Sequence, residues 1–344
     1  MKLAIPSDTN DHIIKSAIQN IASLTRDIEI ERAALLPDCT PSNTLPTGTT
    51  LQISQNQPIS PQFIGMDIGC GYRLSQLDIP LRRIYSKGAL KRDKLSKMVR
   101  QLSNAASPHS KTGTLGKGNH FANIYAVFDV TNQAALNSFG IKQDKPLLLI
   151  HSGSRLKGYA VFTEFQKNGT RQVSNHHYLD EFLKAQQYAK VNREILALRF
   201  LKNLGTDECL LLDIPHNTIR EDNGSYIVQK GTQEIHPGDL GVIPGTATTP
   251  GYLVIGGPDV ASTAYTINHG VGRKFARNNL NGKFGKGEYR RKFANIELNV
   301  SAHLMADEIA QGYRDIHSAI DCLQQHNLAY PIAKIQPLGV VVER

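Results

Sequence analysis

Histidines in short loops of small residues are the most informative feature of this 344-residue chain. The chain has 12 histidines, and five of them lie in loops of small residues beside Gly, Asn, Ser or Pro; one of the five, in His236-Pro237-Gly238, is expected to mark only a turn. One such histidine is usually only a hydrogen-bonding loop residue, whereas four similar loops favour a metal or catalytic cluster, because imidazole binds metals and carries protons near neutral pH. The four loops are Gly118-Asn119-His120, His151-Ser152-Gly153-Ser154-Arg155, Pro215-His216-Asn217 and Asn268-His269-Gly270-Val271-Gly272-Arg273.

A carboxylate and a thiol lie three residues apart in the glycine-rich segment GMDIGCGYR, residues 65–73. Glycines allow the backbone to direct Asp67 and Cys70 towards one point. A thiolate and a carboxylate repel each other, so the pair suits a site that holds a cation. The segment alone is better explained by a buried cysteine and an aspartate in a turn. Together with the histidines it forms a mixed ligand set for Mn, Zn or Fe, with room for two ions if the thiolate bridges.

Apolar patterns predict the elements that position these residues. Strands are expected at 146–150 and 209–214, both buried and each leading directly into a histidine motif; strand ends that feed Gly-rich loops present functional groups to a cleft. Helical periodicity is expected at 12–24, within 87–106 and at 180–204, where Gly205 takes the usual C-cap position. Residues 35–71 are expected to form turns and short strands, 299–327 a helical region and 335–342 a closing strand.

Composition limits the class of protein. No apolar stretch approaches the roughly 18 residues of a membrane span, and the first residues do not resemble a signal peptide. Four cysteines without a CxxC motif suit a reducing cytoplasm. The net charge of +9 favours RNA or DNA as a partner over a lipid surface, and we expect the positive charge to concentrate on the face of the metal cleft. We find no repeat or linker, so residues 1–344 are predicted to form one α+β domain.

The order of the motifs resembles that of the RtcB RNA-splicing ligases. The shared segments are GMDIGCGYRL, GTLGKGNHF, IHSGSR, IPHN, IPGTATTPGY, HGVGR and ADEIAQGYRDI, and the resemblance extends from about Leu36 to the C-terminus. It implies a single composite α+β domain with mixed sheets around a central metal cleft. It also implies a GTP- and manganese-dependent ligase of RNA repair and tRNA splicing. Such an enzyme joins RNA 3′-phosphate or 2′,3′-cyclic phosphate ends to 5′-hydroxyl ends through a guanylylated histidine.

The resemblance also implies roles for individual residues. His269 would be the guanylylated nucleophile, and Arg73, Arg155 and Arg273 are candidates for phosphate contacts because of their placement beside the motifs. The ligands of two Mn²⁺ ions, bridged by Cys70, would be Asp67, Cys70, His120, His151 and His216. The GTP-binding residues would be Asn119, His120, Asn123, Thr246, Gly270, Gly272 and Tyr313.

The chain departs from the family pattern around the guanine base. Asn123 stands where the family has a guanine-reading Glu, and Val342 stands where it has a Lys near the C-terminus. Thr246 and Gly251 replace serines, whereas Tyr313 keeps the aromatic ring that stacks on the base. In the N-terminal motif Asp38 is retained and Thr40 replaces a His. We therefore expect weakened discrimination for guanine.

Two other functions compete with ligation. The first is a two-metal RNA-end phosphatase or phosphodiesterase in which His269 is not nucleotidylated. The second is a non-ligating protein that binds damaged RNA ends, or a partner of a translation or RNA-repair factor. The complete ligand set and His269 favour the ligase, whereas the altered base pocket favours the alternatives over an ordinary GTP-specific enzyme.

Overall fold

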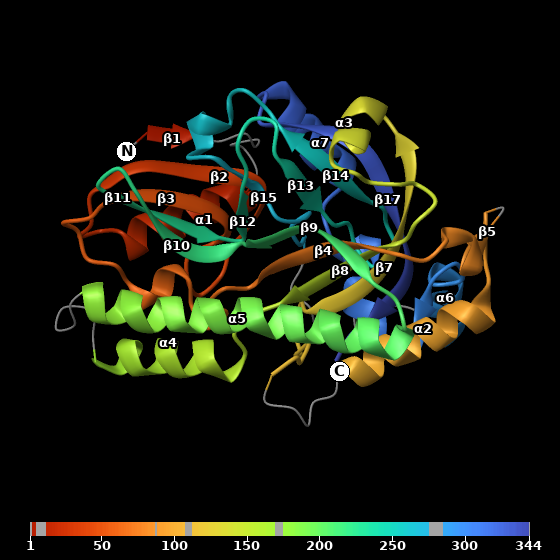
Figure 1. Cartoon of the computed structure of the whole chain (residues 1–344). Helices are drawn as coiled ribbons and strands as arrows, with labels where there is room; N and C mark the ends of the chain where they lie inside the picture. The colour runs from red at the N-terminus through yellow and green to blue at the C-terminus, as the bar shows by residue number, and fades with distance from the viewer. Residues whose placement is uncertain are drawn as a thin grey trace.

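Two β-sheets and one long helix form the frame of the protein (Figure 1). The computed structural model describes residues 2–4, 12–86, 88–106, 112–168, 175–274 and 285–343. Lys87, where the predicted basic helical segment begins, and both ends of the predicted 1–344 domain lie outside these ranges. Within them, no helix is both long and apolar enough to cross a membrane.

The larger sheet has the strand order β13-β14-β17-β7-β8-β4-β9, and β16 pairs with β17. Its neighbours along this path are antiparallel. The strands are β4 (Gly71–Leu77), β7 (Phe121–Val130), β8 (Leu147–Ser152), β9 (Glu208–Pro215), β13 (Leu240–Ile243), β14 (Gly251–Gly256), β16 (Glu297–Leu298) and β17 (Ala329–Val341).

The second sheet has five strands in the order β1-β2-β3-β11-β10 and lies on the left of Figure 1. These are β1 (Lys2–Ala4), β2 (Ile30–Thr40), β3 (Thr47–Ser54), β10 (Asn217–Asp222) and β11 (Ser225–Lys230). Two short ribbons pair β12 (Thr232–Glu234) with β15 (Thr266–Asn268) and β5 (Tyr85–Ser86) with β6 (Ala89–Leu90).

Helix α5 (Asn175–Leu204) runs beneath both sheets in Figure 1. Helix α4 (Leu156–Asn168) packs along one part of it and α2 (Arg92–Ala105) along its C-terminal part. The other helices are α1 (His12–Leu24), α3 (Gln133–Ser138), α6 (Lys286–Lys292) and α7 (Ile316–Gln325). Short 3₁₀ turns lie at 61–63, 81–83, 260–263, 302–308 and 310–312.

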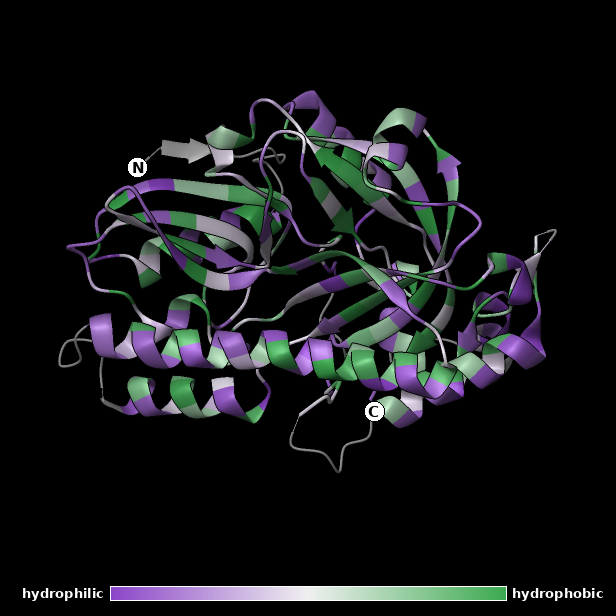
Figure 2. Cartoon of the chain, in the orientation of Figure 1, coloured by the Kyte–Doolittle hydropathy of each residue, from purple (hydrophilic) through white to green (hydrophobic). Residues whose placement is uncertain are grey.

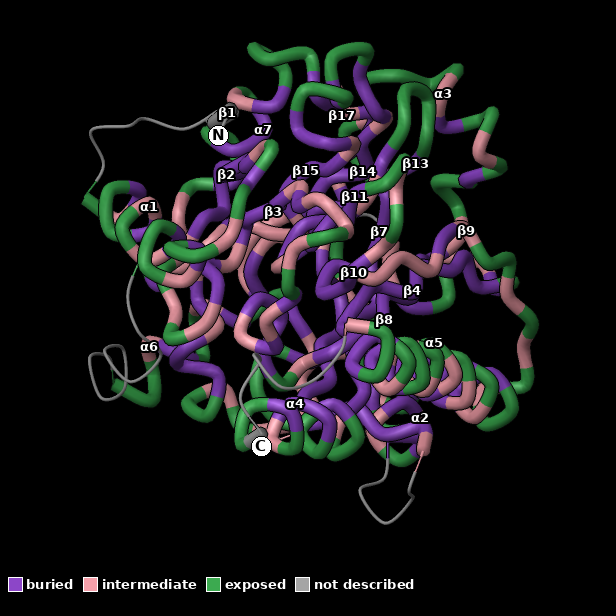
Figure 3. Tube along the Cα trace, turned by 90° about the vertical axis from the view of Figure 1, so that its left-hand side faces the viewer, coloured by how far each residue is buried: buried purple, intermediate pink, exposed green. Residues whose placement is uncertain are grey.

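Helical periodicity explains how α2 and α5 cover the larger sheet. On α2 the predicted stripe of Leu95, Met98, Val99 and Leu102 is buried, and it shares a core with Leu196, Ala197 and Phe200 of α5. Figure 2 shows both helices as alternating apolar and polar bands, and Figure 3 shows a buried and an exposed side on each. Helix α5 ends as predicted, because Gly205 adopts φ +64° and its N–H bonds the carbonyl of Leu201 at 2.8 Å.

Three local predictions were wrong. The 209–214 strand is the edge of its sheet and not buried, with Leu210 exposed. Residues 35–71 hold most of the long strand β2 and all of β3, whose Leu35, Leu51 and Ile53 are core residues set among turn-forming neighbours. Region 299–327 is broken, because Ile309 is extended and Asp315 starts a new helix by capping Ser318 N–H. The α+β class is confirmed, and a single domain over 1–344 stays a prediction.

Candidate metal centre and active site

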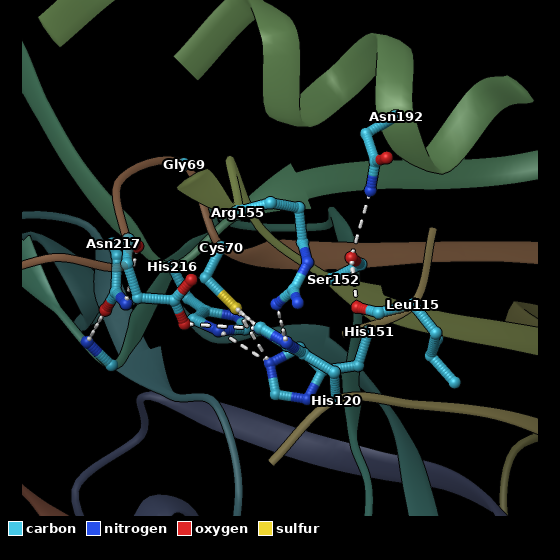
Figure 4. Close-up of polar contacts among 12 residues, drawn as sticks. Gly69, Cys70, Leu115, His120, His151, Ser152, Arg155, Asn192, His216 and Asn217 are labelled. Atoms are coloured by element: carbon cyan, nitrogen blue, oxygen red, sulfur yellow. Dashed lines mark hydrogen bonds and ion pairs between the residues drawn. The ribbon is translucent and has the colours of Figure 1, made fainter. Parts of the chain in front are cut away.

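Four predicted ligands lie at one end of four consecutive strands of the larger sheet. Cys70 and His120 directly precede β4 and β7, whereas His151 and His216 lie at or just after the ends of β8 and β9. The strand order is β7-β8-β4-β9, and each neighbouring pair is antiparallel. The start of one strand therefore lies beside the end of the next at the same end of the sheet, which brings the four side chains together (Figure 4).

The ligand atoms form two groups that share one sulfur. Cys70 Sγ lies 3.1 Å from His151 Nε2 and 3.4 Å from His120 Nε2. His151 Nε2 lies 3.1 Å from His216 Nε2, and His120 Nε2 lies 3.3 Å from Asp67 Oδ2. The first group is Cys70, His151 and His216, the second is Asp67, Cys70 and His120, and within each group the ligand atoms lie within 4.8 Å of one another. Cys70 is thus in the position of a bridging ligand.

The protonation chemistry of the cluster fits divalent cations. Burial lowers the pKa of His151 and of His216 well below the usual value, and neighbouring histidine charges act in the same direction. Two neutral imidazoles that face each other through Nε2 need a proton or a cation between them. Burial, and then the charge of Asp67, raises the pKa of the Cys70 thiol well above its usual value, so a metal ion is what would make it a thiolate. Sulfur, nitrogen and carboxylate oxygen together suit first-row transition metals.

Asp67 is ionised in this environment. Burial opposes its ionisation, but the charge and hydrogen bond of His120 outweigh that effect and hold the pKa of Asp67 below its ordinary value. Lys230 of β11 is a nearby cation whose own pKa is lowered by burial. A Cβ on Gly153 would lie 2.3 Å from Asp67 Oδ1, so the close approach of this carboxylate requires glycine at that position.

Arg193 of α5 holds the backbone beside two of the ligands. Its side chain is buried, and Nη1 donates to the carbonyl of Gly69, next to Cys70, and to the carbonyl of Ser152, next to His151, both at 2.9 Å. Its Nε and Nη2 atoms donate to Asp213 Oδ1 on β9 at 3.0 and 2.6 Å. One guanidinium thus ties together the loop before β4 and the strands β8 and β9.

Asn192, the preceding residue of α5, holds the loop that carries His120. Its Oδ1 accepts from the N–H groups of Gly113 and Thr114 at 2.9 and 3.0 Å, and its Nδ2 donates to Ser152 Oγ at 3.1 Å. Arg155 contacts the ring itself, with Nη1 3.2 Å from His120 Nδ1 (Figure 4). These contacts orient His120 from outside the ligand set, as supporting residues around metal ligands usually do.

His269 follows β15 of the short β12–β15 ribbon and lies beside the cluster. Its Nδ1 lies 2.7 Å from Oδ2 of Asp38, which is fully buried on β2, and the N–H of Gly270 also donates to that oxygen at 3.3 Å. Tyr72 of β4 donates its hydroxyl to the His269 carbonyl at 2.9 Å. The ring centroids of His269 and His216 are 4.5 Å apart. The second nitrogen, Nε2, is therefore the one left for chemistry beside the ligand cluster.

A cavity of about 150 Å³ lies beside His269. It is lined by four of the predicted nucleotide-binding residues, Asn119, Gly270, Gly272 and Tyr313, and by His151, Arg273 and Glu308. Tyr313 also lines a neighbouring cavity of about 220 Å³ with Thr246. Tyr313 donates its hydroxyl to Glu308 and accepts from Arg273, both at 2.6 Å, and the Arg273 guanidinium lies 4.6 Å from the centre of its ring.

The two positions that depart from the family at the base are not among the described residues that line these cavities. Asn123 is buried on β7, where Nδ2 donates to the Tyr125 hydroxyl at 3.1 Å and Oδ1 has no partner among the described residues. Val342 packs with Val340 and Phe121 in an apolar cluster. Arg73 is no phosphate contact: it points to the opposite face of β4 from Tyr72 and forms ion pairs with Glu208 and Asp213.

Comparison with known proteins settles the family. A family model described as tRNA-splicing ligase RtcB matches residues 80–177 and 169–343. The chain belongs to the RtcB family. The resemblance seen in the motifs is thus confirmed.

Curated RtcB relatives match along much of the chain. RNA-splicing ligase RtcB2 of Escherichia coli is 26% identical over 94% of this chain and 90% of its own length. The tRNA-splicing ligase RtcB of Nanoarchaeum equitans is 21% identical over 83% of this chain and 82% of its own. The RNA-splicing ligase RtcB of Mycobacterium bovis is 27% identical over 67% of this chain and 64% of its own.

The sequence missed several residues that shape this RtcB site. Arg193 and Asn192 lie on an amphipathic helix, where polar residues usually face solvent. Lys230 lies on a strand that carries no histidine motif, and Asp38 stands out in the sequence only as a retained motif residue. The roles of the ligand set, of His269 and of the nucleotide-binding residues remain proposals, which the geometry above supports.

Proposed function

We propose that this chain is a cytoplasmic, GTP- and Mn²⁺-dependent RNA ligase. It joins RNA 3′-phosphate or 2′,3′-cyclic phosphate ends to 5′-hydroxyl ends through guanylylated His269. The observation that carries the proposal is the His269 imidazole, bonded through Nδ1 to buried Asp38 and directly beside a two-group ligand cluster. The names of the relatives support RNA as substrate, and four cysteines without a CxxC motif suit a reducing compartment.

Asp67, Cys70, His120, His151 and His216 would hold the Mn²⁺ ions, with Cys70 shared between them. The chemistry that bound ions supply is neutralisation of charge on the phosphoryl oxygens. The rest of the charge compensation belongs to the chain itself. Arg273 lines the cavity beside His269, and Arg155 lies against His120, so both guanidinium groups can meet phosphate oxygens.

The first step is attack of His269 Nε2 on the α-phosphorus of GTP. A P–N bond forms, the P–O bond to pyrophosphate breaks, and pyrophosphate leaves. The Nδ1 proton stays on the ring, which becomes positive as the bond forms. Asp38 is aimed at that proton, so its carboxylate stabilises the charge that develops and holds the tautomer that leaves Nε2 nucleophilic.

The next two steps transfer and release GMP. An oxygen of the RNA 3′-phosphate attacks the GMP phosphorus, the P–N bond breaks, and His269 departs as neutral imidazole. The 5′-hydroxyl then loses its proton and attacks the RNA phosphorus, which displaces GMP and closes the phosphodiester. A 2′,3′-cyclic end first takes up water to become a 3′-phosphate. Water competes at each phosphorus, so the small cavity beside His269 suits this chemistry.

Intact mass after incubation with Mn²⁺ and GTP tests the proposal. A covalent GMP adduct should form, map to His269, be labile to acid, and be lost in His269→Ala and Cys70→Ala. Ligation of a 3′-phosphate strand to a 5′-hydroxyl strand should follow. Hydrolysis of RNA ends without any adduct would instead indicate the two-metal phosphatase or phosphodiesterase. RNA binding without adduct or hydrolysis would indicate a non-ligating end-binding protein.

A further inference from the structure

A second cavity, of about 580 Å³, lies apart from the metal cluster. It is formed where the C-terminal end of α5 meets α2 and the 3₁₀ turn at 81–83, at the right-hand end of the long helix in Figure 1. Its volume exceeds that of the cavity beside His269 and that of the neighbouring cavity lined by Thr246. The lining residues are Ile79, Arg82, Arg83, Ile84, Lys91, Lys94, Lys97, Met98, Gln101, Leu204 and Gly205.

The rim of this cavity is strongly basic. Five of its lining residues are exposed cations, and among the described lining residues there is no carboxylate. The ion pairs described nearby join Arg92 to Glu297 and Lys145 to Asp78, and among the described residues no ion pair involves any of the five cations. A concave surface of one sign concentrates the potential and attracts an anion.

The position of these cations on α2 disfavours the isolated helix. Lys91 is the N-cap residue, without a side-chain capping bond, and Lys94 lies in the first turn, where the helix dipole prefers acidic groups. Asp93 is the one acidic residue of that turn. Lys91, Lys94 and Lys97 also repeat every three residues and so repel one another along one side of the helix. A bound polyanion would offset both effects.

The floor of the cavity has a different character. Ile79, Ile84 and Met98 supply apolar surface beneath the cations. Gln101 donates through Nε2 to the Asn203 carbonyl at 2.6 Å, and its buried Oε1 has no partner among the described residues. Phosphates at the rim, an apolar face below and an unused acceptor at the side match a nucleotide, whose base is flat and carries N–H donors.

We propose that this cavity binds a single-stranded segment of the RNA substrate away from its reacting end, an inference that rests on the proposed ligase function. Helix α5 links the two sites, because Asn192 bonds the loops of the metal cluster and Leu204 lines the cavity. At 1.5 Å per residue these two positions are about 18 Å apart along the axis, the length of roughly five stacked nucleotides. Only a strand longer than this can contact both sites.

The test compares Lys94→Ala/Lys97→Ala with Lys142→Ala/Lys190→Ala, a control that removes two exposed lysines elsewhere. Binding of a labelled 20-nucleotide single-stranded RNA with an unreactive 3′-hydroxyl is followed by fluorescence anisotropy across a salt series. Each phosphate contact to a single strand contributes about 0.7 to the salt slope. The cavity variant should therefore lose about 1.4 from the slope and about tenfold in affinity near 0.15 M salt. The control should match the unaltered protein.

Strand length gives a second readout. With a strand of about four nucleotides, the cavity variant and the control should bind alike, because such a strand does not span the two sites. Equal binding of the 20-nucleotide strand by both variants would overturn the inference. It would also be overturned if the cavity variant lost binding to anionic phosphoinositide vesicles while its RNA binding stayed unchanged, because the cavity would then bind a lipid surface. GMP labelling of His269 is measured separately in both variants. Absence of labelling in the unaltered protein together with the expected anisotropy result would overturn the ligase proposal and leave the RNA site standing.

Discussion

The imidazole of His269 and the carboxylate of Asp38 are joined by a hydrogen bond of 2.7 Å, although 231 positions separate them in the sequence. Asp38 lies on β2 of the five-stranded sheet, and His269 follows β15 of a separate ribbon. The same carboxylate oxygen accepts from the Gly270 N–H at 3.3 Å. The bond fixes the ring and its tautomer, so Asp38 is a positioning residue for the nucleophile.

Asp38→Asn tests this positioning role. The amide is isosteric, but it loses the charge that stabilises the guanylylated ring and permits the wrong tautomer. We expect the rate of His269 labelling by GTP to fall by about 10³- to 10⁴-fold, because the change of a triad aspartate to Asn lowers kcat by about 10⁴-fold. Divalent-metal affinity, measured by calorimetry, should change by less than about threefold, because Asp38 lies outside the ligand set. A labelling rate near that of the unaltered protein would contradict the role.

How much of this site the sequence revealed depended on residue type. His120, His151, His216 and the Asp67–Cys70 pair could be found because chemically active residues stood among glycines, and the family motifs supported them. Their convergence could not be derived, because it depends on the antiparallel order β7-β8-β4-β9. Arg73 was misjudged for a related reason: in a strand with alternating faces, Tyr72 points towards the site and Arg73 away from it.

Buried polar residues were the hardest to foresee. Arg193 lies on α5, where a charged residue usually reads as solvent-facing, yet it is among the most buried side chains of the described chain. The burial is possible because Asp213 and two carbonyls satisfy it. These partners come from three separate segments of the chain, so no local sequence pattern predicts them.

Arg193→Met should be strongly destabilising. The change leaves the buried Asp213 carboxylate with only its longer contact to Arg73, and it leaves two carbonyls without their donor. Breaking a buried ion pair costs about 3–5 kcal/mol. The free energy of unfolding is measured with urea on metal-free protein. Mn²⁺ affinity should also fall by about 10–100-fold, the usual effect of removing support from ligand loops.

The double variant Arg193→Met/Asp213→Leu separates the two roles. Removing the unpaired carboxylate should recover much of the stability. Mn²⁺ affinity should stay low, because the carbonyls of Gly69 and Ser152 still lack their donor. Recovery of both stability and metal affinity would show that Arg193 does not position the ligand loops.

The stability of the metal-free protein should fall as the pH decreases below about 6.5. The pKa values of His151 and His216 are lowered in the fold, so the unfolded chain binds more protons between its own histidine pKa and the folded one. Stability therefore rises with pH in that window, is fully present above about pH 6.5 and is lost as the pH falls. Urea midpoints between pH 8 and pH 5 in the presence of a chelator measure it.

His151→Asn/His216→Asn should flatten that profile, whereas His326→Asn, a change at an exposed histidine, should leave it unchanged. The window stops at pH 8 because the raised pKa of Cys70 has the opposite sign: stability from its neutral thiol is lost only as the pH rises above about 8.5. A profile with the same slope in the double variant would assign the pH dependence to other groups.

Gly153→Ala should weaken metal binding through Asp67. The added Cβ would lie 2.3 Å from Asp67 Oδ1, so the carboxylate must move away from His120. We expect a loss of about 10–100-fold in the affinity for one of two Mn²⁺ ions, seen as an altered second phase in calorimetry. Gly285→Ala is the control, because its Cβ would meet no atom within 4 Å. Two unchanged binding phases in Gly153→Ala would remove Asp67 from the proposed ligand set.

Nucleotide choice should be relaxed, because the positions that would read guanine are occupied differently. Asn123 offers one buried acceptor and commits its amide to Tyr125, and Val342 packs in an apolar cluster with Val340 and Phe121. A pocket built to hydrogen-bond a ligand rejects analogues by about 10⁴-fold or more, and these side chains cannot supply that selectivity. Tyr313 can still stack on any base once Arg273 moves from its ring. We therefore expect His269 to be labelled by ATP and GTP at rates within about tenfold of each other, a factor that corresponds to about 1.4 kcal/mol.

Labelling with each of four radiolabelled nucleoside triphosphates in the presence of Mn²⁺ measures this preference. The family resemblance implies that a Glu at position 123 accepts from both N–H groups on the guanine edge, so Asn123→Glu should raise labelling by GTP selectively, even though Asn123 is not among the described residues that line the cavities. Asn123→Gln is the matched control, because it adds the same length without the charge and should leave the ratio of GTP to ATP unchanged. A preference for GTP above about 10³-fold in the unaltered protein would contradict relaxed specificity. Guanine reading would then belong to another cavity residue, and Glu308, whose carboxylate already lies at the Tyr313 hydroxyl, is the first to replace.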